Sequence, residues 1–377
     1  MRIGVNTRFL IKDKLEGLGR YSHEVISRMV KDHPEHEFVF FFDRDYSEEF
    51  IYADNVTPVK VFPPARHPFL WYLWFEWALP RAIKKYKIDY FFSPDSFLMG
   101  QSSVKQHLVV HDLAFEHVEN GVGGLVQKYY KRFLPKYCKS AERIVTVSHF
   151  TKQDVVNQYG ISPEIIDVAH NGASSTFAPV SESSKTEIKS KFTHGAEYFV
   201  FVGAMHPRKN ISRLLQAFDQ FKSQNESDFK LVLVGRKAWQ NEEMEMVYEQ
   251  MNHKQDVVFT GRLSDDDLAS VIGSAYAMAY VPLFEGFGLP ILESNQCGVP
   301  VICSNTSSMP EVGGDACVLV DPYSVQSISE GMNCIIQEDK YKEIKSKCKL
   351  NAERFSWDTT AQLVWESMMK GVGNANI

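Results

Sequence analysis

The sequence lacks the features of a membrane-spanning, disulfide-bonded or nucleic-acid-binding protein. No apolar run approaches the roughly 20 residues that a membrane-spanning helix needs. The six cysteines show no CxxC spacing, and several stand in apolar runs typical of buried free thiols in a reducing compartment. The formal net charge of -6 gives no sign of nucleic-acid binding. At 377 residues the chain is longer than one typical core, so we expect a cytoplasmic protein of two globular domains.

The chain also lacks a complete dinucleotide-binding fingerprint. Gly17 and Gly19 lie between the first predicted strand and a helix, but Ser22 stands where the third glycine of that motif belongs. A dehydrogenase is therefore disfavoured. The two glycines would let the backbone approach a phosphate, although an ordinary flexible loop explains them equally well.

Short apolar runs alternate with helical patterns along both halves of the chain. This alternation predicts an α/β fold with two Rossmann-like, doubly wound parallel sheets that face each other across a cleft. We expect an N-terminal domain over residues 1–178 and a C-terminal domain over 190–357, joined by a polar linker at 179–187. Residues 358–377 are expected to form a final helix that packs back on the N-terminal domain. The clearest predicted strands are Ile3–Asn6, Phe38–Phe42, Tyr90–Ser93, Leu108–His111, Ile144–Ser148, Tyr198–Gly203, Lys230–Gly235, Val257–Gly261, Ala277–Pro282, Val299–Ser304 and Cys317–Val320.

A glycine-rich loop separates two carboxylates in the second half of the chain. Glu285 follows the apolar run 275–283, and Glu293 lies on the helix predicted after the loop. Open α/β sheets bind ligands at the carboxyl ends of their strands, so this position suits an extended ligand held at both ends. Taken alone, the segment is explained equally well by a glycine-rich turn followed by a surface glutamate.

Two cations stand at the end of the first predicted strand of this half. Arg208 and Lys209 follow Gly203 and precede a predicted helix. Arginine offers a bidentate fork, lysine offers a point charge, and the helix start adds backbone donors, so the segment predicts a diphosphate site. Solvated surface cations are the alternative.

The first half offers weaker polar candidates at its strand ends. His111 and Asp112 follow the strand predicted at 108–111, and Ser148 ends the strand predicted at 144–148. A capping or core histidine, and a serine that only begins a helix, are the simpler explanations.

Two acidic groups imitate metal sites. Asp43 and Asp45 follow an apolar run but have no third ligand nearby in sequence, and 265–267 matches the acid-rich start of a helix. We predict no metal at either place.

The segment 69–80 is rich in aromatic residues. Core packing is the expectation for Trp71, Trp74 and Trp77. Because the cations Arg81, Lys84, Lys85 and Lys87 lie beside it, contact with a lipid-linked acceptor or a membrane surface is the alternative.

Together these segments resemble the retaining GT-B glycosyltransferases of the large family with the E-x7-E motif, which includes bacterial mannosyltransferases and sucrose synthase. The resemblance extends over nearly the whole chain and is strongest at 203–210, 231–235, 257–268 and 280–311. It implies that Glu285 contacts the transferred sugar and that Glu293 contacts the nucleotide ribose. It further implies catalytic roles for His111, Arg208, Lys209 and Glu285, donor contacts from Gly17, Gly19, Gly203, Gly235, Arg262, Leu263, Gly286, Phe287, Gly288, Leu289 and Glu293, and acceptor-side roles for Asp112 and Ser148.

The activity that this resemblance implies is retaining, metal-independent hexosyl transfer without a cofactor. Some relatives place an arginine directly after the glycine that is Gly203 here, whereas this chain has Ala204, so Arg208 and Lys209 must carry the charge. The 203–210 segment favours GDP-mannose as donor. The expected acceptor is a saccharide or lipid-linked saccharide of bacterial surface polysaccharide synthesis, with peripheral contact at the inner face of the cytoplasmic membrane as a hypothesis. A UDP-sugar donor, an epimerase, a phosphorylase and a non-catalytic sugar-nucleotide-binding module stay open as alternatives.

Overall fold

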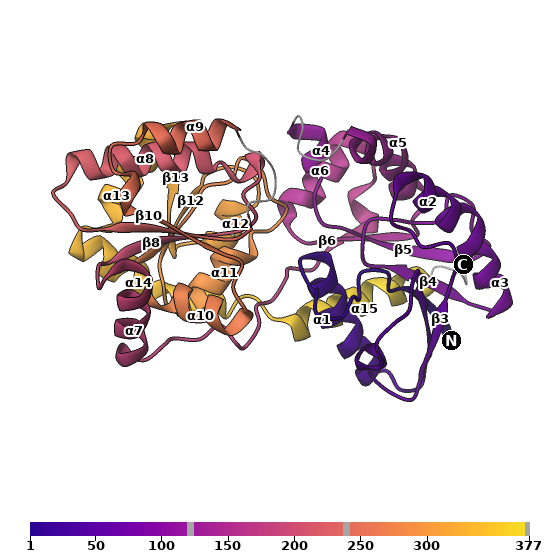
Figure 1. The fold of residues 1–377 in the computed structure, drawn as a ribbon. Helices are drawn as coiled ribbons and strands as arrows, with labels where there is room; N and C mark the ends of the chain where they lie inside the picture. The colour runs from indigo at the N-terminus through magenta and orange to yellow at the C-terminus, as the bar shows by residue number, and fades with distance from the viewer. Residues whose placement is uncertain (119–123, 237–241, 374–377) are drawn as a thin grey trace. The chain divides into compact units, whose positions relative to one another are not determined.

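The computed structural model describes residues 1–118, 124–236 and 242–373 and divides the chain into two compact units (Figure 1). The N-terminal unit comprises Met1–Asn171 together with the last segment from Ser356, and the C-terminal unit comprises Gly172–Phe355. Each unit is a parallel sheet with helices on both faces. The positions of the two units relative to one another are not determined.

The sheet of the N-terminal unit has seven strands in the order β3-β2-β1-β4-β5-β6-β7, and all of its pairs are parallel. Two edge strands were not predicted from the sequence. β3 contains Pro58, which is tolerated at a sheet edge but weakens a strand pattern, and β7 has only three residues. The strands are β1 Arg2–Asn6, β2 Glu37–Phe42, β3 Val56–Lys60, β4 Tyr90–Ser93, β5 Lys105–Val110, β6 Arg143–Thr146 and β7 Ile166–Val168.

The sheet of the C-terminal unit has six parallel strands in the order β10-β9-β8-β11-β12-β13. The near-continuous apolar sequences of β8, β9, β11 and β12 follow from burial on both faces of the sheet, whereas the edge strands β10 and β13 are only partly buried. Every strand predicted for this half is present, so the prediction of two doubly wound parallel sheets is confirmed. The strands are β8 Tyr198–Val202, β9 Lys230–Val234, β10 Val257–Gly261, β11 Ala277–Tyr280, β12 Val301–Ser304 and β13 Cys317–Val320.

The helices connect successive strands and cover the sheets. In the N-terminal unit they are α1 Leu18–Asp32, α2 Pro68–Leu73, α3 Leu79–Lys85, α4 Ala114–His117, α5 Gly124–Ser140, α6 His149–Tyr159 and α15 Trp357–Gly373. In the C-terminal unit they are α7 Glu182–Thr193, α8 Ile211–Gln224, α9 Glu242–Gln250, α10 Asp265–Ser274, α11 Leu289–Gln296, α12 Met309–Gly313, α13 Val325–Ile335 and α14 Glu338–Ala352.

The helix α7 corrects the predicted linker at 179–187. Ser181 is its N-cap, and the Ser181 hydroxyl accepts a hydrogen bond from the backbone N–H of Ser184 at 3.2 Å. The serines that suggested a linker therefore begin a helix. The boundary between the two units along the chain falls between Asn171 and Gly172, earlier than the predicted boundaries at 178 and 190.

The last helix, α15, packs within the N-terminal unit. The Arg28 side chain on α1 contacts the Asp358 carboxylate at 2.5 Å, and the rings of Tyr21 and Trp357 meet edge to face at 5.9 Å. Lys370 reaches Asp167 in the middle of β7 at 3.1 Å. The chain thus crosses to the C-terminal unit and returns.

The aromatic segment at 69–80 divides between core and surface. Trp74 is fully buried and donates to Val61 O at 3.0 Å, and Trp71 donates to Ala65 O at 2.8 Å. The core expectation is therefore confirmed for these two tryptophans. It is wrong for Trp77, which is 56% exposed and lies in the π-helical turn Trp74–Ala78. Within the described residues, no helix combines the length and the apolar character needed to cross a bilayer.

Two glycines bring the ends of β8, β9 and β10 together. Gly203 N–H donates to Val234 O, and Gly235 N–H donates to Gly261 O, each at 2.9 Å. A Cβ atom on Gly235 would lie 1.9 Å from Gly203 O, so no other residue fits without moving a backbone.

We expect Gly235→Ala to lower the free energy of unfolding of the C-terminal unit by about 2 kcal/mol or more, because the new methyl group collides with a carbonyl oxygen. Urea denaturation measures the change. Gly373→Ala is the matched control, since a Cβ there meets nothing within 4 Å. Equal stability of the two variants would contradict the prediction.

Candidate active site

Three charged side chains meet where β8 and β11 end. Arg208 Nη1 lies 2.6 Å from Glu285 Oε1, and Lys209 Nζ lies 2.6 Å from the same oxygen. Arg208 also donates to Phe284 O at 3.1 Å, and Lys209 donates to the Tyr280 hydroxyl at 2.5 Å. Residues about 76 positions apart in the sequence thus form one cluster at the carboxyl edge of the sheet.

The cluster has a buried carboxylate and two half-buried cations, and so carries an excess positive charge. Glu285 is only 9% exposed. Burial by itself would raise the pKa of its carboxyl group, but the charges and hydrogen bonds of Arg208 and Lys209 outweigh burial and lower that pKa to about 2. Glu285 is therefore ionised at neutral pH, and two cations face one anion. The remaining positive charge favours an anionic ligand.

The loop after β8 is held to the end of β11 by Asn210. The backbone of Asn210 has a left-handed φ of 62°. The side-chain amide of Asn210 donates to Val281 O at 3.0 Å and to Pro322 O at 2.7 Å. In addition, Leu283 N–H donates to Arg208 O at 2.9 Å. These bonds fix Arg208 and Lys209, which lie in the short 3₁₀ helix Pro207–Lys209 before α8.

The loop after Glu285 is held by two serines that follow β12. The fully buried Ser308 hydroxyl lies within hydrogen-bond distance of Glu285 O and Phe287 O, at 2.9 and 3.0 Å, and Glu285 N–H donates to Ser307 Oγ at 3.3 Å. Gly288, the N-cap of α11, has a φ of 99°, a conformation that favours glycine. The loop thus presents its backbone in one defined shape.

The other predicted donor-binding residues lie at the same edge of the sheet. Gly286 and Phe287 are buried in the loop after Glu285, and half-buried Leu289 is the first residue of α11. Half-buried Glu293 lies in the second turn of α11. Gly203 and Gly235 end β8 and β9 in contact with one another, while exposed Arg262 and half-buried Leu263 follow β10. The contacts of all these residues with a donor stay predictions.

His111 follows β5 in the N-terminal unit, at the carboxyl edge of that sheet. Its Nε2 lies 2.7 Å from Pro94 O, and because a carbonyl only accepts, Nε2 carries the proton. Burial lowers the pKa of His111 more than the neighbouring carboxylates of Asp112 and Asp95 raise it, so the ring is neutral near pH 7. In the neutral ring, Nδ1 keeps a lone pair that can accept a hydrogen bond.

The remaining N-terminal candidates have clear structural roles. Asp112 accepts from Ala114 N–H at 2.9 Å, and Ser148 is the fully buried N-cap of α6, where it accepts from Thr151 N–H at 3.0 Å. Gly17 is the N-cap of α1 with a φ of 43°, and Gly19 lies so close to Phe9 O that a Cβ would be 2.7 Å away. Their proposed contacts with donor or acceptor stay predictions.

A buried ion pair beside His111 was not predicted. Arg8 Nε lies 2.5 Å from Asp95 Oδ2, both side chains are buried, and the guanidinium lies 3.9 Å from the centre of the Phe97 ring. Asn6 donates to the other Asp95 oxygen at 2.8 Å. These bonds hold the turn whose Pro94 carbonyl orients His111. The available signal was that Asn6 ends one strand and Asp95 follows another, so both lie at one edge of the sheet.

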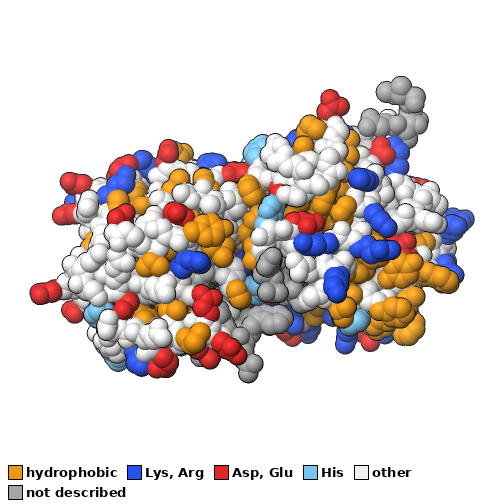
Figure 2. All heavy atoms as spheres, turned by 90° about the horizontal axis from the view of Figure 1, so that it is seen from above, with side chains coloured by type: hydrophobic (Ala, Val, Ile, Leu, Met, Phe, Trp, Pro, Cys, Tyr) orange, Lys and Arg blue, Asp and Glu red, His pale blue; other side chains and the backbone are white. Residues whose placement is uncertain are grey.

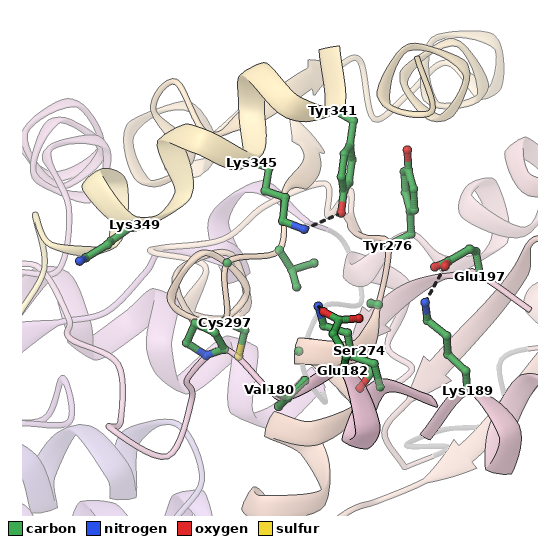
Figure 3. A pocket seen from close by; sticks show the side chains of 16 residues that line it. Val180, Glu182, Lys189, Glu197, Ser274, Tyr276, Cys297, Tyr341, Lys345 and Lys349 are labelled. Carbon is green, nitrogen blue, oxygen red and sulfur yellow. Dashed lines mark hydrogen bonds and ion pairs between the residues drawn. The ribbon is translucent and has the colours of Figure 1, made fainter. Parts of the chain in front are cut away.

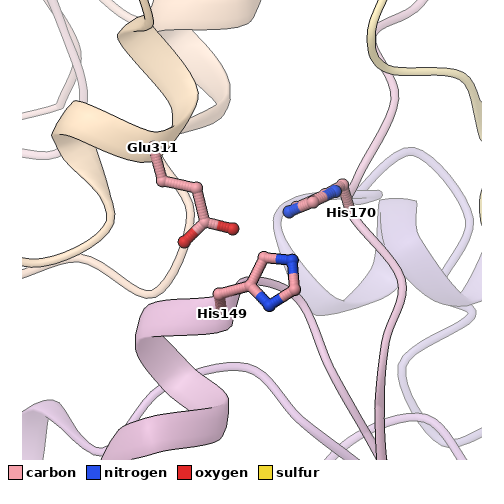
Figure 4. A group of neighbouring side chains, drawn as sticks. All are labelled: His149, His170 and Glu311. Atoms are coloured by element: carbon pink, nitrogen blue, oxygen red, sulfur yellow. The ribbon is translucent and has the colours of Figure 1, made fainter.

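The acidic groups weighed as metal ligands have other partners. Asp43 binds the Arg44 guanidinium at 2.6 Å, Asp45 binds Lys60 at 2.6 Å, and Ser264 caps α10 by accepting from Asp267 N–H. His149 and His170 lie edge to face in the N-terminal unit with ring centroids 5.6 Å apart (Figure 4). Glu311, drawn with them, belongs to the C-terminal unit, whose position relative to the histidines is not determined.

Two family models match the chain, one in each half. Residues 15–176 match Glycosyltransferase Family 4, and residues 183–355 match Glycosyl transferases group 1. The chain is 29% identical to the O-antigen chain mannosyltransferase B of Escherichia coli over 366 residues, which cover 92% of this chain and 94% of the relative. It is 26% identical to the O-antigen chain mannosyltransferase RfbU of Salmonella typhimurium over 326 residues, which cover 85% of this chain and 86% of the relative.

Solved structures of similar fold cover nearly the whole chain. The sucrose-phosphate synthase of Thermosynechococcus elongatus superposes with a TM-score of 0.78 at 15% identity and covers 100% of both chains. The Anabaena protein HepE, in complex with UDP and glucose, superposes with a TM-score of 0.76 at 16% identity and covers 98% of this chain and 100% of its own. At these identities the likeness concerns the fold.

We expect Glu285→Gln to lower the free energy of unfolding at pH 7 by on the order of 3 kcal/mol, because two half-buried cations lose their buried carboxylate partner. The folded-state pKa of Glu285, about 2, lies below the ordinary value of 4.5. The stabilisation that the ionised Glu285 carboxylate gives to the folded state is therefore complete above about pH 4.5 and is lost as the pH falls toward 2. The difference in free energy of unfolding between wild type and variant should narrow over the same range.

Urea denaturation at pH 7, 5, 4 and 3 measures this gap. Glu330→Gln, at an exposed position on α13, is the control and should leave stability nearly unchanged at every pH. A gap between wild type and Glu285→Gln that stays constant from pH 7 to 3 would show that the carboxylate is not held by the two cations.

Proposed function

The chain belongs to the GT-B glycosyltransferases, and we propose that it transfers mannose from GDP-mannose to a saccharide or lipid-linked saccharide in bacterial surface polysaccharide synthesis, with retention at the anomeric carbon. The cluster of Arg208, Lys209 and Glu285 carries the proposal, since it offers an anion site at the carboxyl edge of the sheet. The two O-antigen mannosyltransferase relatives support the sugar and the pathway.

The two cations act on the leaving group. As the bond between the anomeric carbon and the diphosphate breaks, negative charge develops on the phosphate oxygens. Arg208 and Lys209 are already fixed in place, so they stabilise this charge without reorganising. In this proposal they supply the charge that a metal ion would otherwise provide, and the reaction is metal-independent.

Other groups orient the donor. The Glu293 carboxylate is an acceptor-only group that suits the two ribose hydroxyls, and Glu285 with the backbone N–H groups of 286–288 suits the sugar. In the N-terminal unit, the Nδ1 lone pair of His111 suits a sugar hydroxyl. Correct orientation of a bound donor is itself a large part of catalysis.

Retention is proposed to follow a front-face route. Glu285 is paired with two cations, which makes its carboxylate a poor nucleophile. The acceptor oxygen therefore bonds to the anomeric carbon on the face from which the diphosphate leaves. The acceptor proton passes to the departing phosphate oxygen, so charges and atoms balance.

A donor panel tests the substrate. GDP and GDP-mannose should raise the midpoint temperature of thermal unfolding more than UDP- or ADP-sugars do, because a ligand that binds the folded state stabilises that state. A product assay with GDP-mannose should proceed fully in EDTA. Selective stabilisation by a UDP-sugar would reassign the donor, and an absolute requirement for Mg²⁺ or Mn²⁺ would overturn the metal-free mechanism.

We expect Lys209→Ala to reduce turnover at least about tenfold with a smaller effect on KM, because the lost charge acts mainly in the transition state. Steady-state kinetics with GDP-mannose measures the loss. Lys191→Ala, an exposed position on α7, is the control and should turn over normally. Near-normal turnover by Lys209→Ala would exclude its role in stabilising the leaving group.

We further propose that the protein docks at the inner face of the cytoplasmic membrane. A basic face of the N-terminal unit supports this part of the proposal. This basic face consists of α2, the π-helical turn and α3 (68–85) together with α5 (124–140), and rings of Tyr72 and Phe133 join the two segments at 5.9 Å. Phe69 is 63% exposed there and Trp77 56%. The cations of the face are Arg81, Lys84, Lys85, Lys128, Lys131, Arg132, Lys136 and Lys139, and its one acid is Glu76.

This concentration of positive charge stands out in a chain of net charge -6. Figure 2 shows Lys and Arg side chains gathered beside hydrophobic ones over the N-terminal unit, on the right. Exposed aromatic rings beside lysines and arginines match an anionic lipid surface, where the rings enter the headgroup region and the cations meet the lipid charge.

We expect the wild-type protein to float with vesicles that contain phosphatidylglycerol and not with pure phosphatidylcholine vesicles, and the flotation to weaken at high salt. The double variant Phe69→Ser/Trp77→Ser should float less. Leu350→Ser, at a 70% exposed position of the C-terminal unit, is the control. Equal flotation with phosphatidylglycerol and phosphatidylcholine vesicles would contradict the proposed docking by the basic face. An equal loss of flotation in the control variant Leu350→Ser would contradict it as well.

A further inference from the structure

A pocket lies in the C-terminal unit, away from the charged cluster. It has a volume of about 460 Å³, within the range of small-molecule sites. Its walls come from α7, the end of α10, the turn after α11 and one face of α14 (Figure 3). The segment that enters the unit after Gly172 contributes Pro179 and Val180.

This pocket lies at the opposite edge of the sheet from the donor site. Glu197 precedes β8, Tyr276 precedes β11 and Val299 precedes β12, so the pocket is at the amino ends of these strands. Arg208 and Glu285 follow the carboxyl ends of β8 and β11. Strands of four or five residues separate the two edges by about 15 Å, so the pocket is a distinct site.

Lysines from two helices converge on the pocket. Lys185 pairs with Glu182 at 2.7 Å, and Lys189 pairs with Glu197 at 2.5 Å, and all four residues line the pocket. Lys345 on α14 donates to the Tyr341 hydroxyl at 3.1 Å, and its ammonium lies 5.1 Å from the centre of the Tyr341 ring. It makes no ion pair among the described residues. Lys185, and to a smaller extent Lys189 and Lys345, lower the pKa of Glu182, which shows that these charges share one region.

The pocket also offers groups that suit a sugar ring. Tyr276 and Tyr341 stack with centroids 4.3 Å apart and form an aromatic wall, which Figure 3 shows beside the Lys345 ammonium. Glu182 and Glu197 are acceptors for hydroxyl groups. Cations for a phosphate, carboxylates for hydroxyls and an aromatic surface for a ring together describe a phosphorylated sugar.

We propose that this pocket, named here the amino-edge site, binds a hexose phosphate, with Lys185 and Lys345 on the phosphate and the carboxylates of Glu182 and Glu197 on the sugar hydroxyls. The ligand ties α7, which follows the entry segment of the unit, to α14. The amino-edge site is independent of the proposed donor specificity, because it shares no residue with the donor site.

Isothermal titration calorimetry with mannose 6-phosphate tests the amino-edge site. We expect saturable binding to the wild-type protein, at least tenfold weaker binding to Lys185→Ala/Lys345→Ala, and unchanged binding to Arg208→Ala/Lys209→Ala. Lys340→Ala/Lys342→Ala also removes two positive charges, but from a part of α14 outside the pocket, and this control variant should bind mannose 6-phosphate as the wild type does. Mannose without phosphate should bind at least tenfold more weakly.

Three results would overturn the proposal. One is the absence of saturable binding to the wild-type protein. Another is loss of binding in Arg208→Ala/Lys209→Ala with retention in Lys185→Ala/Lys345→Ala, which would place the ligand in the donor site. The third is equal weakening by Lys340→Ala/Lys342→Ala, which would reveal general charge attraction. Unchanged thermal unfolding of the lysine variants confirms that they are folded.

Discussion

One carboxylate oxygen shared by two cations organises the carboxyl edge of the C-terminal sheet. Glu285 Oε1 accepts from both Arg208 and Lys209, and so it joins the loop after β8 to the loop after β11. Burying a carboxylate beside two half-buried cations is costly unless the charges are paired. The surrounding bonds meet that requirement, because Asn210 fixes the loop that carries the cations and Ser308 fixes the loop that carries the carboxylate.

The same arrangement separates two chemical tasks within the unit. At the carboxyl edge, two cations against one anion leave a site that attracts a diphosphate, and the glycines at 203 and 235 keep side chains out of the space beside it. At the amino edge, lysines of α7 and α14 surround a separate cavity. Parallel strands make this possible, since every strand starts at one edge and ends at the other.

Much of the fold follows from local sequence. The buried strands of both sheets, the helix after Lys209, the helix start at 265–267 and the two-sheet architecture were predicted from sequence patterns. The GT-B resemblance is confirmed by the family matches and the similar folds. The edge strands β3 and β7 were missed because a proline or a short length removes the apolar signal. The linker was wrong because N-capping serines and linker serines look alike in sequence.

The sequence alone determined which segments carry charge, glycine and apolar residues, because these are local properties of the chain. It therefore located Arg208, Lys209 and Glu285 at strand ends. Only the tertiary structure decided that Arg208 and Lys209 share one oxygen of Glu285 and that Ser308 holds the loop that carries Glu285. It also decided that Arg8 and Asp95 support the turn that orients His111. Such contacts join residues from different strands, and their geometry follows from the order and register of strands in the sheet, which no local pattern encodes.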